Sequence, residues 1–231
     1  MRKYLAILLI GTTITTVVSN ESTPVEPYPY RPDIVIIDTG TTKSYEGFLR
    51  MKSSCVSKCW HSHGELITEA LIEELSMQGM EREVHAEHLV WETALDIPSL
   101  IDRAASLSPK VIIIAISGDE PITEEFLAIK RATDKGISVV AASGNVGGQN
   151  SQYPARYNLP CLTSVSTKKY GSKVATANVG EIYLEQMSGE KGTSFSTARA
   201  GALVVKLHER FGNIKCNIVK SLLVEEFGSA Q

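Results

Sequence analysis

The sequence predicts an α/β protein in which a parallel β-sheet carries helices on both of its faces. Short apolar runs alternate along the chain with longer segments whose apolar residues recur at helical spacing. The runs 33–37, 111–116 and 137–142 are nearly continuous, as expected of parallel strands that are buried on both sides. Alternation of this kind places the connecting helices against the sheet. The 231 residues are enough for one such domain with a sizeable core.

The elements follow one another in a simple order. Residues 33–37 form the first strand, and the segment after it predicts a helix because its apolar residues are Leu66, Ile67, Ala70, Leu71 and Leu75. The predicted helices are 64–79, 97–107, 122–135, 194–211 and 217–227. The further predicted strands are 84–91, 111–116 and 137–142, with short strands or loops at 163–167 and 174–187.

Polar residues stand where predicted strands end and helices begin. Asp38, Ser117 and Asn145 follow three of the strands, while His63 and Ser194 adjoin the N-termini of two helices. The carboxyl ends of parallel strands share one edge of the sheet, and ligands of such sheets bind outside that edge. The sequence therefore predicts a site where these side chains meet on rigid supports.

Four short motifs supply what a serine nucleophile needs. Ser194 lies in GTSFSTA, His63 in WHSHG, Asp38 in DIVIIDTG and Asn145 in VVAASGN. A serine hydroxyl requires an imidazole to take its proton, and the imidazole requires a carboxylate that orients it. The oxyanion formed by attack on an amide needs hydrogen-bond donors, which the Asn145 side chain and the Ser194 N–H can provide.

These motifs resemble those of the subtilisin-like serine proteases, the subtilases, over residues 33 to about 201. The order Asp, His, Asn, Ser differs from the triad orders of chymotrypsin-like proteases and of α/β-hydrolases. The resemblance implies a subtilisin-like three-layer sandwich and a serine endopeptidase. It also implies a catalytic triad of Asp38, His63 and Ser194, with an oxyanion hole formed by Asn145 and the Ser194 N–H.

The resemblance also implies substrate-binding residues. Ser117 and Gly118 would form an extended edge that pairs with the peptide backbone, although an ordinary turn would explain them equally well. Tyr153, in Tyr-Pro-Ala, matches the segment beside the specificity pocket, or is part of a packing loop. Gly144, in the Gly-Asn motif, is assigned to substrate binding with them.

The chain departs from the family pattern near the nucleophile and the base. Ser196 stands where alanine is usual, Ala198 where proline is usual, and Glu65 where a small hydroxyl residue is usual. Glu65 brings a carboxylate near the base, and the segment between Asn145 and Ser194 is short, which indicates trimmed loops. The alternative function is therefore a catalytically impaired, subtilase-like protein that binds peptides without cutting them.

Residues 1–19 have the layout of a secretory signal peptide, with Arg2 and Lys3 before a short apolar run and a small residue at Ser19. A membrane anchor is the alternative, but the run is short for a span. We expect one subtilisin-like peptidase domain over 20–231, secreted or periplasmic and free of the membrane after cleavage. Its net charge is −5, from 21 basic and 26 acidic residues, which gives no basic stripe for nucleic acid.

Four cysteines in an exported chain favour two disulfides. Three connectivities are possible for Cys55, Cys59, Cys161 and Cys216. We favour Cys55–Cys59, just before His63, and Cys161–Cys216, which would tie a late strand to the last helix. Free buried thiols are the alternative.

No cofactor and no metal site is assigned from the sequence. His61, His63, His85 and His88 could in principle hold zinc, but the motifs of zinc sites are missing, and His85, His88 and His208 are interpreted as surface residues. Calcium is common among the subtilases, yet no ligand cluster can be named. The partner is a peptide or protein substrate. Since residues 20–37 leave no room for a folded prodomain, the domain folds unaided or uses a separate chaperone or inhibitor chain.

Overall fold

The described part of the chain comprises residues 31–41, 43, 45, 49–53, 63–80, 84–90, 94–185, 187, 189 and 191–228 of a computed structural model. By its contacts the chain divides into Met1–Tyr30 and Arg31–Gln231, and every described residue belongs to the second unit. The predicted signal peptide lies outside the described residues. Among the described helices, none combines the length and the apolar character needed to cross a bilayer.

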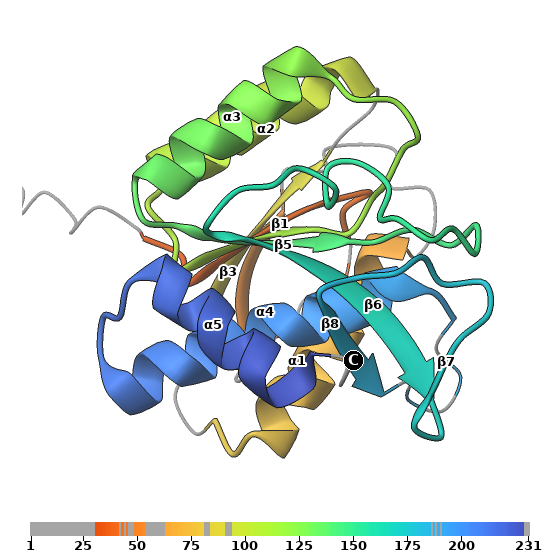
Figure 1. Ribbon diagram of the computed structural model, residues 1–231. Coiled ribbons are helices and arrows are strands. Elements are labelled where there is room, and N and C mark those ends of the chain that lie inside the picture. Colours follow the sequence, from red (N-terminus) through yellow and green to blue (C-terminus); the bar gives the residue numbers. More distant parts are fainter. Residues whose placement is uncertain are drawn as a thin grey trace, which may run out of the picture. The chain divides into compact units, whose positions relative to one another are not determined.

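A twisted sheet forms the centre of this unit (Figure 1). Its strands run in the order β2-β3-β1-β4-β5-β6-β7, and β8 pairs with β6 beside this path. All these pairings are parallel except that of β6 with β7. The strands are β1 (Ile34–Asp38), β2 (Leu49–Ser53), β3 (Val84–Val90), β4 (Val111–Ile114), β5 (Ser138–Ala142), β6 (Leu162–Lys169), β7 (Ser172–Lys173) and β8 (Ile182–Glu185).

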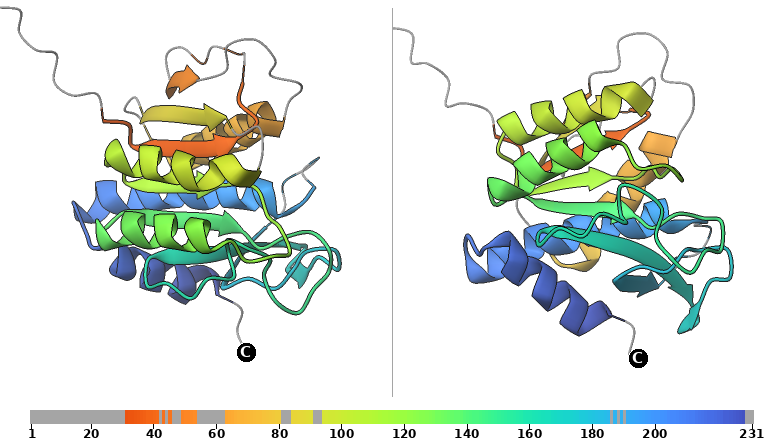
Figure 2. Two further views of the ribbon diagram at one scale, coloured as in Figure 1. Left: turned by 90° about the horizontal axis from the view of Figure 1, so that it is seen from above. Right: turned by 45° about the horizontal axis from the view of Figure 1, so that its top comes forward.

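Helices cover both faces of the sheet, so the predicted fold class is confirmed (Figures 1 and 2). Helices α2 and α3 pack together on one face, and α1, α4 and α5 lie on the other. Strand β1 shows why, since Ile34 and Ile36 face the core beneath α1 and α4 while Val35 and Ile37 face the core beneath α2 and α3. The helices are α1 (His63–Met77), α2 (Ile97–Ser106) after the 3₁₀ turn Ala94–Asp96, α3 (Thr123–Asp134), α4 (Thr193–Phe211) and α5 (Cys216–Phe227).

Two parts of the sheet differ from the sequence-based prediction. Strand β2 was not predicted, although LRMKS has the alternation of apolar and charged residues typical of an edge strand. The segment 174–187 agrees with the prediction of short strands or loops, since it contributes the four-residue strand β8. Strand β6 extends on both sides of the predicted 163–167, because it pairs with β5, β7 and β8.

The predicted disulfide between Cys161 and Cys216 is present, with 5.2 Å between the two Cα atoms. Cys161 directly precedes β6 and Cys216 is the first residue of α5. The bond therefore attaches the last helix to the sheet. Cys55 and Cys59 lie outside the described residues.

A buried ion pair joins the two helices that begin at the site. Arg199 of α4 donates from Nε to Glu74 Oε2 of α1 at 2.7 Å, and its Nη1 donates to the Glu185 carbonyl at the end of β8. Both charged groups are almost fully buried, so removing either one would leave an uncompensated charge in the core. This pair fixes α1 against α4 and hence the relative positions of their N-termini.

Candidate active site

The predicted site residues meet at the carboxyl edge of the sheet. Strand β1 ends at Asp38 between β3 and β4, where the chain winds outward in both directions. Open α/β sheets bind their ligands at such a point. The N-termini of α1 and α4 reach the same edge and bring His63 and Ser194 to it.

His63 and Asp38 are joined by a close hydrogen-bonded contact. His63 Nδ1 lies 2.8 Å from Asp38 Oδ1 and 2.9 Å from Oδ2, and the Asp38 side chain is fully buried. Thr39 supports this carboxylate, since its N–H and its hydroxyl both donate to Oδ1. The Thr39 hydroxyl in turn accepts the N–H of Gly64 at 3.0 Å. This network links the end of β1 to the first turn of α1.

Gly64, directly after His63, allows the backbone of α1 to lie close to the backbone that follows β1. A Cβ on Gly64 would lie 2.4 Å from the Gly40 carbonyl oxygen and 2.8 Å from Cε1 of His88. Any side chain at this position would therefore push α1 away from β1 and stretch the contact between His63 and Asp38. Glycine at position 64 is therefore required for this close approach, and Gly40 of the DTG motif has a φ of 86°, which favours glycine.

The hydrogen bond to Asp38 raises the pKa of His63 above its ordinary value of 6.5. Burial of the ring lowers this pKa, and the negative charge of Asp38 raises it further, so the pKa is raised in net. Because Asp38 holds Nδ1, Nε2 is left as the nitrogen that can exchange a proton with a ligand. His63 is thus suited to serve as a base.

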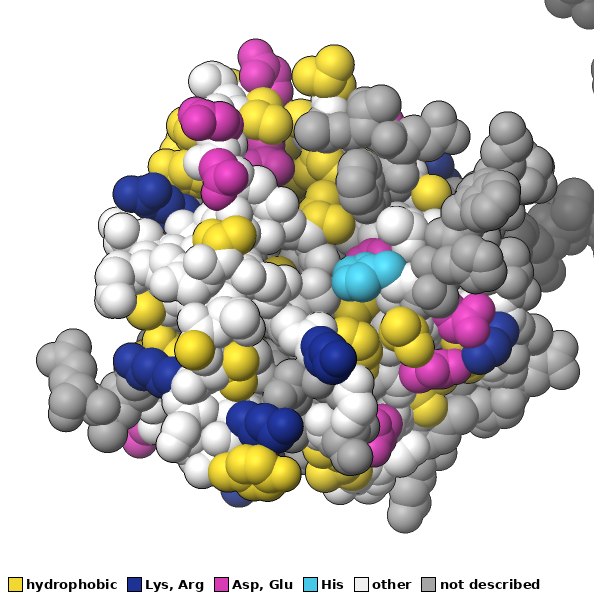
Figure 3. All heavy atoms as spheres, turned by 90° about the vertical axis from the view of Figure 1, so that its right-hand side faces the viewer, with side chains coloured by type: hydrophobic (Ala, Val, Ile, Leu, Met, Phe, Trp, Pro, Cys, Tyr) yellow, Lys and Arg dark blue, Asp and Glu magenta, His cyan; other side chains and the backbone are white. Residues whose placement is uncertain are grey.

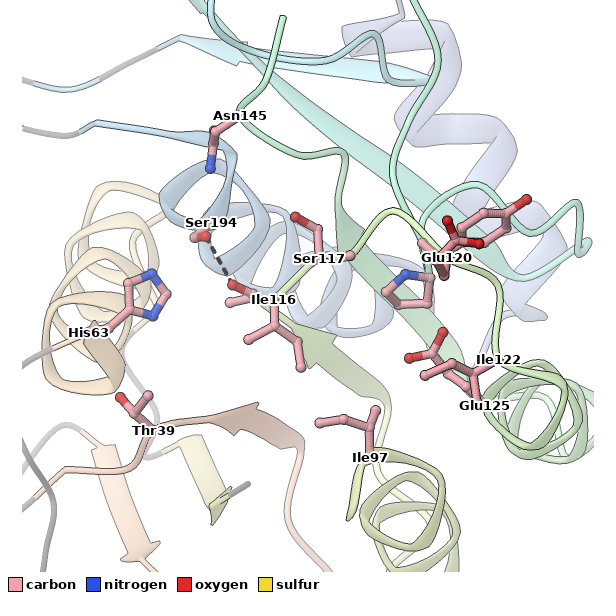
Figure 4. Close-up of a pocket in the computed structure, with 14 residues that line it drawn as sticks. Thr39, His63, Ile97, Ile116, Ser117, Glu120, Ile122, Glu125, Asn145 and Ser194 are labelled. Atoms are coloured by element: carbon pink, nitrogen blue, oxygen red, sulfur yellow. Dashed lines mark hydrogen bonds between the residues drawn. The ribbon is translucent and has the colours of Figure 1, made fainter. Parts of the chain in front are cut away.

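Ser194 stands in the first turn of α4, with Gly192 as the N-cap residue. Its Oγ donates to the Ala115 carbonyl at 2.9 Å, and the residue is 8% exposed. Figure 4 shows this bond and draws His63 and Ser194 among the residues that line the same cavity. The hydroxyl proton is therefore directed at Ala115, and its transfer to His63 requires that the hydroxyl turn away from this carbonyl.

The side-chain oxygen of Asn145 accepts a hydrogen bond from the first turn of α4. Thr193 N–H donates to Asn145 Oδ1 at 2.9 Å, which leaves the amide nitrogen pointing toward Ser194 (Figure 4). Gly192 has φ 100° and a Cβ there would lie 3.1 Å from the Asn145 side chain, so only glycine fits without strain. The N–H groups of a first helical turn have no partner within the helix. The Ser194 N–H and the Asn145 amide can consequently donate to one oxyanion.

A cavity of about 400 Å³ opens from these groups across the surface. Figure 3 shows a histidine side chain beside a hollow on this face, with hydrophobic and acidic side chains on its far side. The residues that line the cavity are Thr39, His63, Ile97, Ala115, Ile116, Ser117, Gly118, Glu120, Ile122, Glu125, Asn145, Tyr153, Pro154 and Ser194. The cavity thus brings His63, Ser194 and Asn145 together with apolar walls (Figure 4).

The residues predicted to bind substrate occupy different positions. Ser117, Gly118 and Tyr153 line the cavity. The backbone of Gly118 already exchanges two hydrogen bonds of 2.8 Å with Tyr153, so it has no N–H or C=O left for a peptide on that side. In an extended strand the backbone N–H and C=O groups of successive residues point to opposite sides. The backbone groups of Ser117 therefore point away from Tyr153. Gly144 is buried and outside the lining, and its N–H donates to Thr193 Oγ1.

The departures from the family pattern are accommodated by the structure. Helix α4 runs unbroken past Ser196 and Ala198, whose side chains are buried in it. Glu65 pairs with Lys43 at 2.5 Å, and it is not among the groups that shift the pKa of His63. Glu65 therefore forms an ion pair with Lys43 and does not shift the pKa of His63, contrary to the hypothesis that it acts on this base.

The interpretation of His88 as a surface residue was wrong. His88 lies in β3 opposite Ile36 and is fully buried behind the pair of His63 and Asp38. Burial lowers its pKa to about 4, while the charge of Asp38 opposes this change and that of His63 adds to it. His85 and His208 are partly buried. Alternation within VHAEHLV could have placed residues 86 and 88 on one face, but it could not show which face packs against α1.

We expect His88 to make the fold sensitive to acid. A lowered pKa in the folded state means that the unfolded chain binds more protons, so stability is complete above pH 6.5 and declines as the pH falls toward 4. A shift of this size corresponds to about 3 kcal/mol. Urea unfolding of His88→Gln across this pH range should show a shallower loss of stability than the native protein. His85→Gln, from the same strand, is the matched control, and equal slopes in all three proteins would contradict this role.

No three histidine, cysteine or carboxylate side chains gather as a metal site within the described part of the chain. His61, one member of the zinc hypothesis, lies outside it.

Comparison with known proteins shows the fold. No protein-family model and no curated protein matches the chain. Among solved structures, the prenylagaramide maturation protease PagA is similar with 16% identity and a TM-score of 0.60, over 81% of each chain. A mutant of the protease domain of PatA has 18% identity and a TM-score of 0.61, over 84% of this chain and 87% of its own. A psychrophilic protease has 18% identity and a TM-score of 0.66, over 84% and 82%.

Proposed function

We propose that this protein is a serine endopeptidase of the subtilisin-like type. The observation that carries the proposal is the contact of His63 Nδ1 with the buried Asp38 carboxylate, in a cavity that Ser194 also lines. The three solved structures with the same fold are named as proteases, which supports a peptide or protein substrate.

Hydrolysis would begin with attack of Ser194 Oγ on the scissile carbonyl carbon. His63 Nε2 takes the hydroxyl proton, and Asp38 stabilises the imidazolium and holds its orientation. The oxyanion accepts hydrogen bonds from the Ser194 N–H and from the Asn145 amide nitrogen. His63 then gives the proton to the leaving amine, which breaks the C–N bond and leaves an acyl-enzyme.

Water then hydrolyses the acyl-enzyme, and His63 again acts first as base and then as acid. His63 removes a proton from the water as it attacks the ester carbonyl, and it returns the proton to Ser194 Oγ as the acid product leaves. The backbone of the segment from Ala115 to Ser117 would pair with the peptide backbone and hold it in an extended form.

The proposal includes an exported protein that needs no cofactor. The disulfide between Cys161 and Cys216 is consistent with an oxidising compartment. The signal peptide would be removed after Ser19 in the course of export, and the domain would fold unaided or with a separate chaperone or inhibitor chain.

Digestion of a peptide library, read by mass spectrometry, tests the proposal most directly. We expect cleavage products together with labelling by a fluorophosphonate probe, which reacts only with an activated serine. A protein that binds peptides but yields neither products nor labelling would be the peptide-binding alternative instead.

The pH dependence should follow the raised pKa of His63. Only neutral His63 can accept the proton, so kcat/KM is expected to rise with pH through an apparent pKa above about 6.5. Glu65→Thr should leave this limb in place, because the Glu65 carboxylate is held by Lys43. Initial rates on one peptide substrate, from mildly acidic to mildly basic pH, provide the measurement. A downward shift of the limb in Glu65→Thr would show that Glu65 acts on the ring.

A further inference from the structure

Two carboxylates lie in the cavity, away from the reacting groups. Glu120 and Glu125 line it beyond Ile116, which stands between them and Ser194 in Figure 4. No lysine or arginine is among the described residues that line it. Arg156, which stacks over the Tyr153 ring at 5.6 Å, is the nearby cation, and it is exposed. This end of the cavity therefore carries acidic side chains without a basic partner in its lining.

Glu125 does not accept the capping hydrogen bond that a glutamate at its position in a helix usually accepts. It is the third residue of α3, where the carboxylate commonly accepts the N–H of the N-cap residue. Here that N–H, from Ile122, donates to the Tyr157 hydroxyl at 2.9 Å, and the hydroxyl donates back to the Ile122 carbonyl at 2.9 Å. Tyr157 thus replaces Glu125 in the cap.

The Glu125 carboxylate is buried and incompletely satisfied. The residue is 6% exposed, and its Oε1 has no hydrogen-bond partner within the described part of the chain. Burial raises the pKa of Glu125, and the Tyr157 hydroxyl only partly opposes this. A buried carboxylate oxygen without a hydrogen-bond partner is unfavourable, and a cation placed against the Glu125 carboxylate would offset that cost.

The walls around the carboxylates fit a long basic side chain. Ile97, Ile116 and Ile122 line the cavity there. Lysine and arginine bury their methylene stems against apolar surface while the charged end seeks a carboxylate. Apolar walls together with the Glu125 carboxylate in the same lining match both parts of such a side chain.

We propose that this end of the cavity is a specificity subsite for a lysine or arginine of the peptide substrate, with Glu125 as its principal partner and Glu120 as the second. The inference rests on the proposed peptidase function, because the same peptide must reach Ser194. Because the two glutamates lie beyond Ile116 from Ser194, the basic residue of an extended peptide would lie away from the scissile bond.

Binding to the Ser194→Ala protein tests the subsite without requiring catalysis. A fluorescent peptide set carries lysine, arginine, norleucine or glutamate at each position in turn, and affinity is read by anisotropy. At one position we expect peptides with lysine or arginine to bind roughly 10- to 100-fold tighter than the peptide with norleucine. This ratio corresponds to the usual free energy of a hydrogen bond to a charged group. Glu125→Gln should remove that preference and leave the norleucine peptides unchanged.

The matched control is Glu124→Gln, which removes a charge from the same helical turn. Glu124 is exposed and outside the cavity lining, so this variant should keep the full preference. If no position favours a basic residue, or if Glu125→Gln keeps the preference at full size, the subsite does not exist. A tighter fit of norleucine than of lysine would show that Glu125 serves only as part of an apolar pocket.

Hydrolysis of the norleucine peptides by the native protein separates the two proposals. Cleavage of these peptides without any preference for lysine would overturn the subsite and leave the peptidase function standing. Absence of cleavage, combined with lysine affinity that depends on Glu125, would overturn the peptidase function and retain a peptide-binding site.

Discussion

Replacement of Ser194 by alanine is expected to abolish fluorophosphonate labelling and to lower kcat/KM by at least about 10⁴-fold. The effect is large because Ser194 is the nucleophile that the proposed mechanism requires, and without it His63 would have no hydroxyl to activate. The cost in stability should be small, since the variant loses only the hydrogen bond to Ala115, worth about 1 kcal/mol. Rates on one peptide substrate and thermal unfolding provide the measurements.

Ser196→Ala is the matched control for this variant. Ser196 lies two residues further along α4, is fully buried, and its Oγ has no hydrogen-bond partner among the described residues. Its replacement should leave labelling and hydrolysis close to native. Retained labelling in Ser194→Ala, or loss of labelling in Ser196→Ala alone, would show that a different serine reacts.

The sequence predicted the sheet and the meeting of the site residues because both depend on local patterns. Buried parallel strands give apolar runs such as 111–116, and their carboxyl ends must share an edge. Asp38 and Asn145 directly follow such runs, while His63 and Ser194 begin helices that return to the same edge. Each placement needed only the residues within a few positions of the motif.

The surroundings of these residues could not be predicted, because they depend on contacts between distant segments. Glu65 follows the base in sequence, yet Lys43 from another segment determines where its carboxylate goes. His88 has the alternation of an ordinary strand residue, and its burial depends on tertiary packing that brings Gly64 of α1 close to its ring. Glu125 has the pattern of a first-turn glutamate that suits the helix dipole, and it enters the cavity because Tyr157, from a segment far along the chain, caps α3 instead.

Replacement of Asn145 by alanine is expected to lower kcat by about 10²–10³-fold with little change in KM. The reason is that the amide nitrogen meets the oxyanion, which exists only after attack, and not the planar carbonyl of the bound peptide. Loss of a donor that acts in the transition state appears in kcat, whereas loss of uniform binding appears in KM. Steady-state rates on one peptide substrate distinguish the two.

Asn145 also has a structural contact, because its Oδ1 accepts the Thr193 N–H at 2.9 Å. Asn145→Ala removes that bond together with the donor, so a second variant is needed to separate them. Asn145→Asp keeps an oxygen for Thr193 and replaces the NH₂ group by a second oxygen, which repels an oxyanion. If the donor matters, Asn145→Asp should be at least as slow as Asn145→Ala. Near-native kcat in Asn145→Asp would mean that the side chain only positions the first turn of α4, and the oxyanion would then depend on the Ser194 N–H.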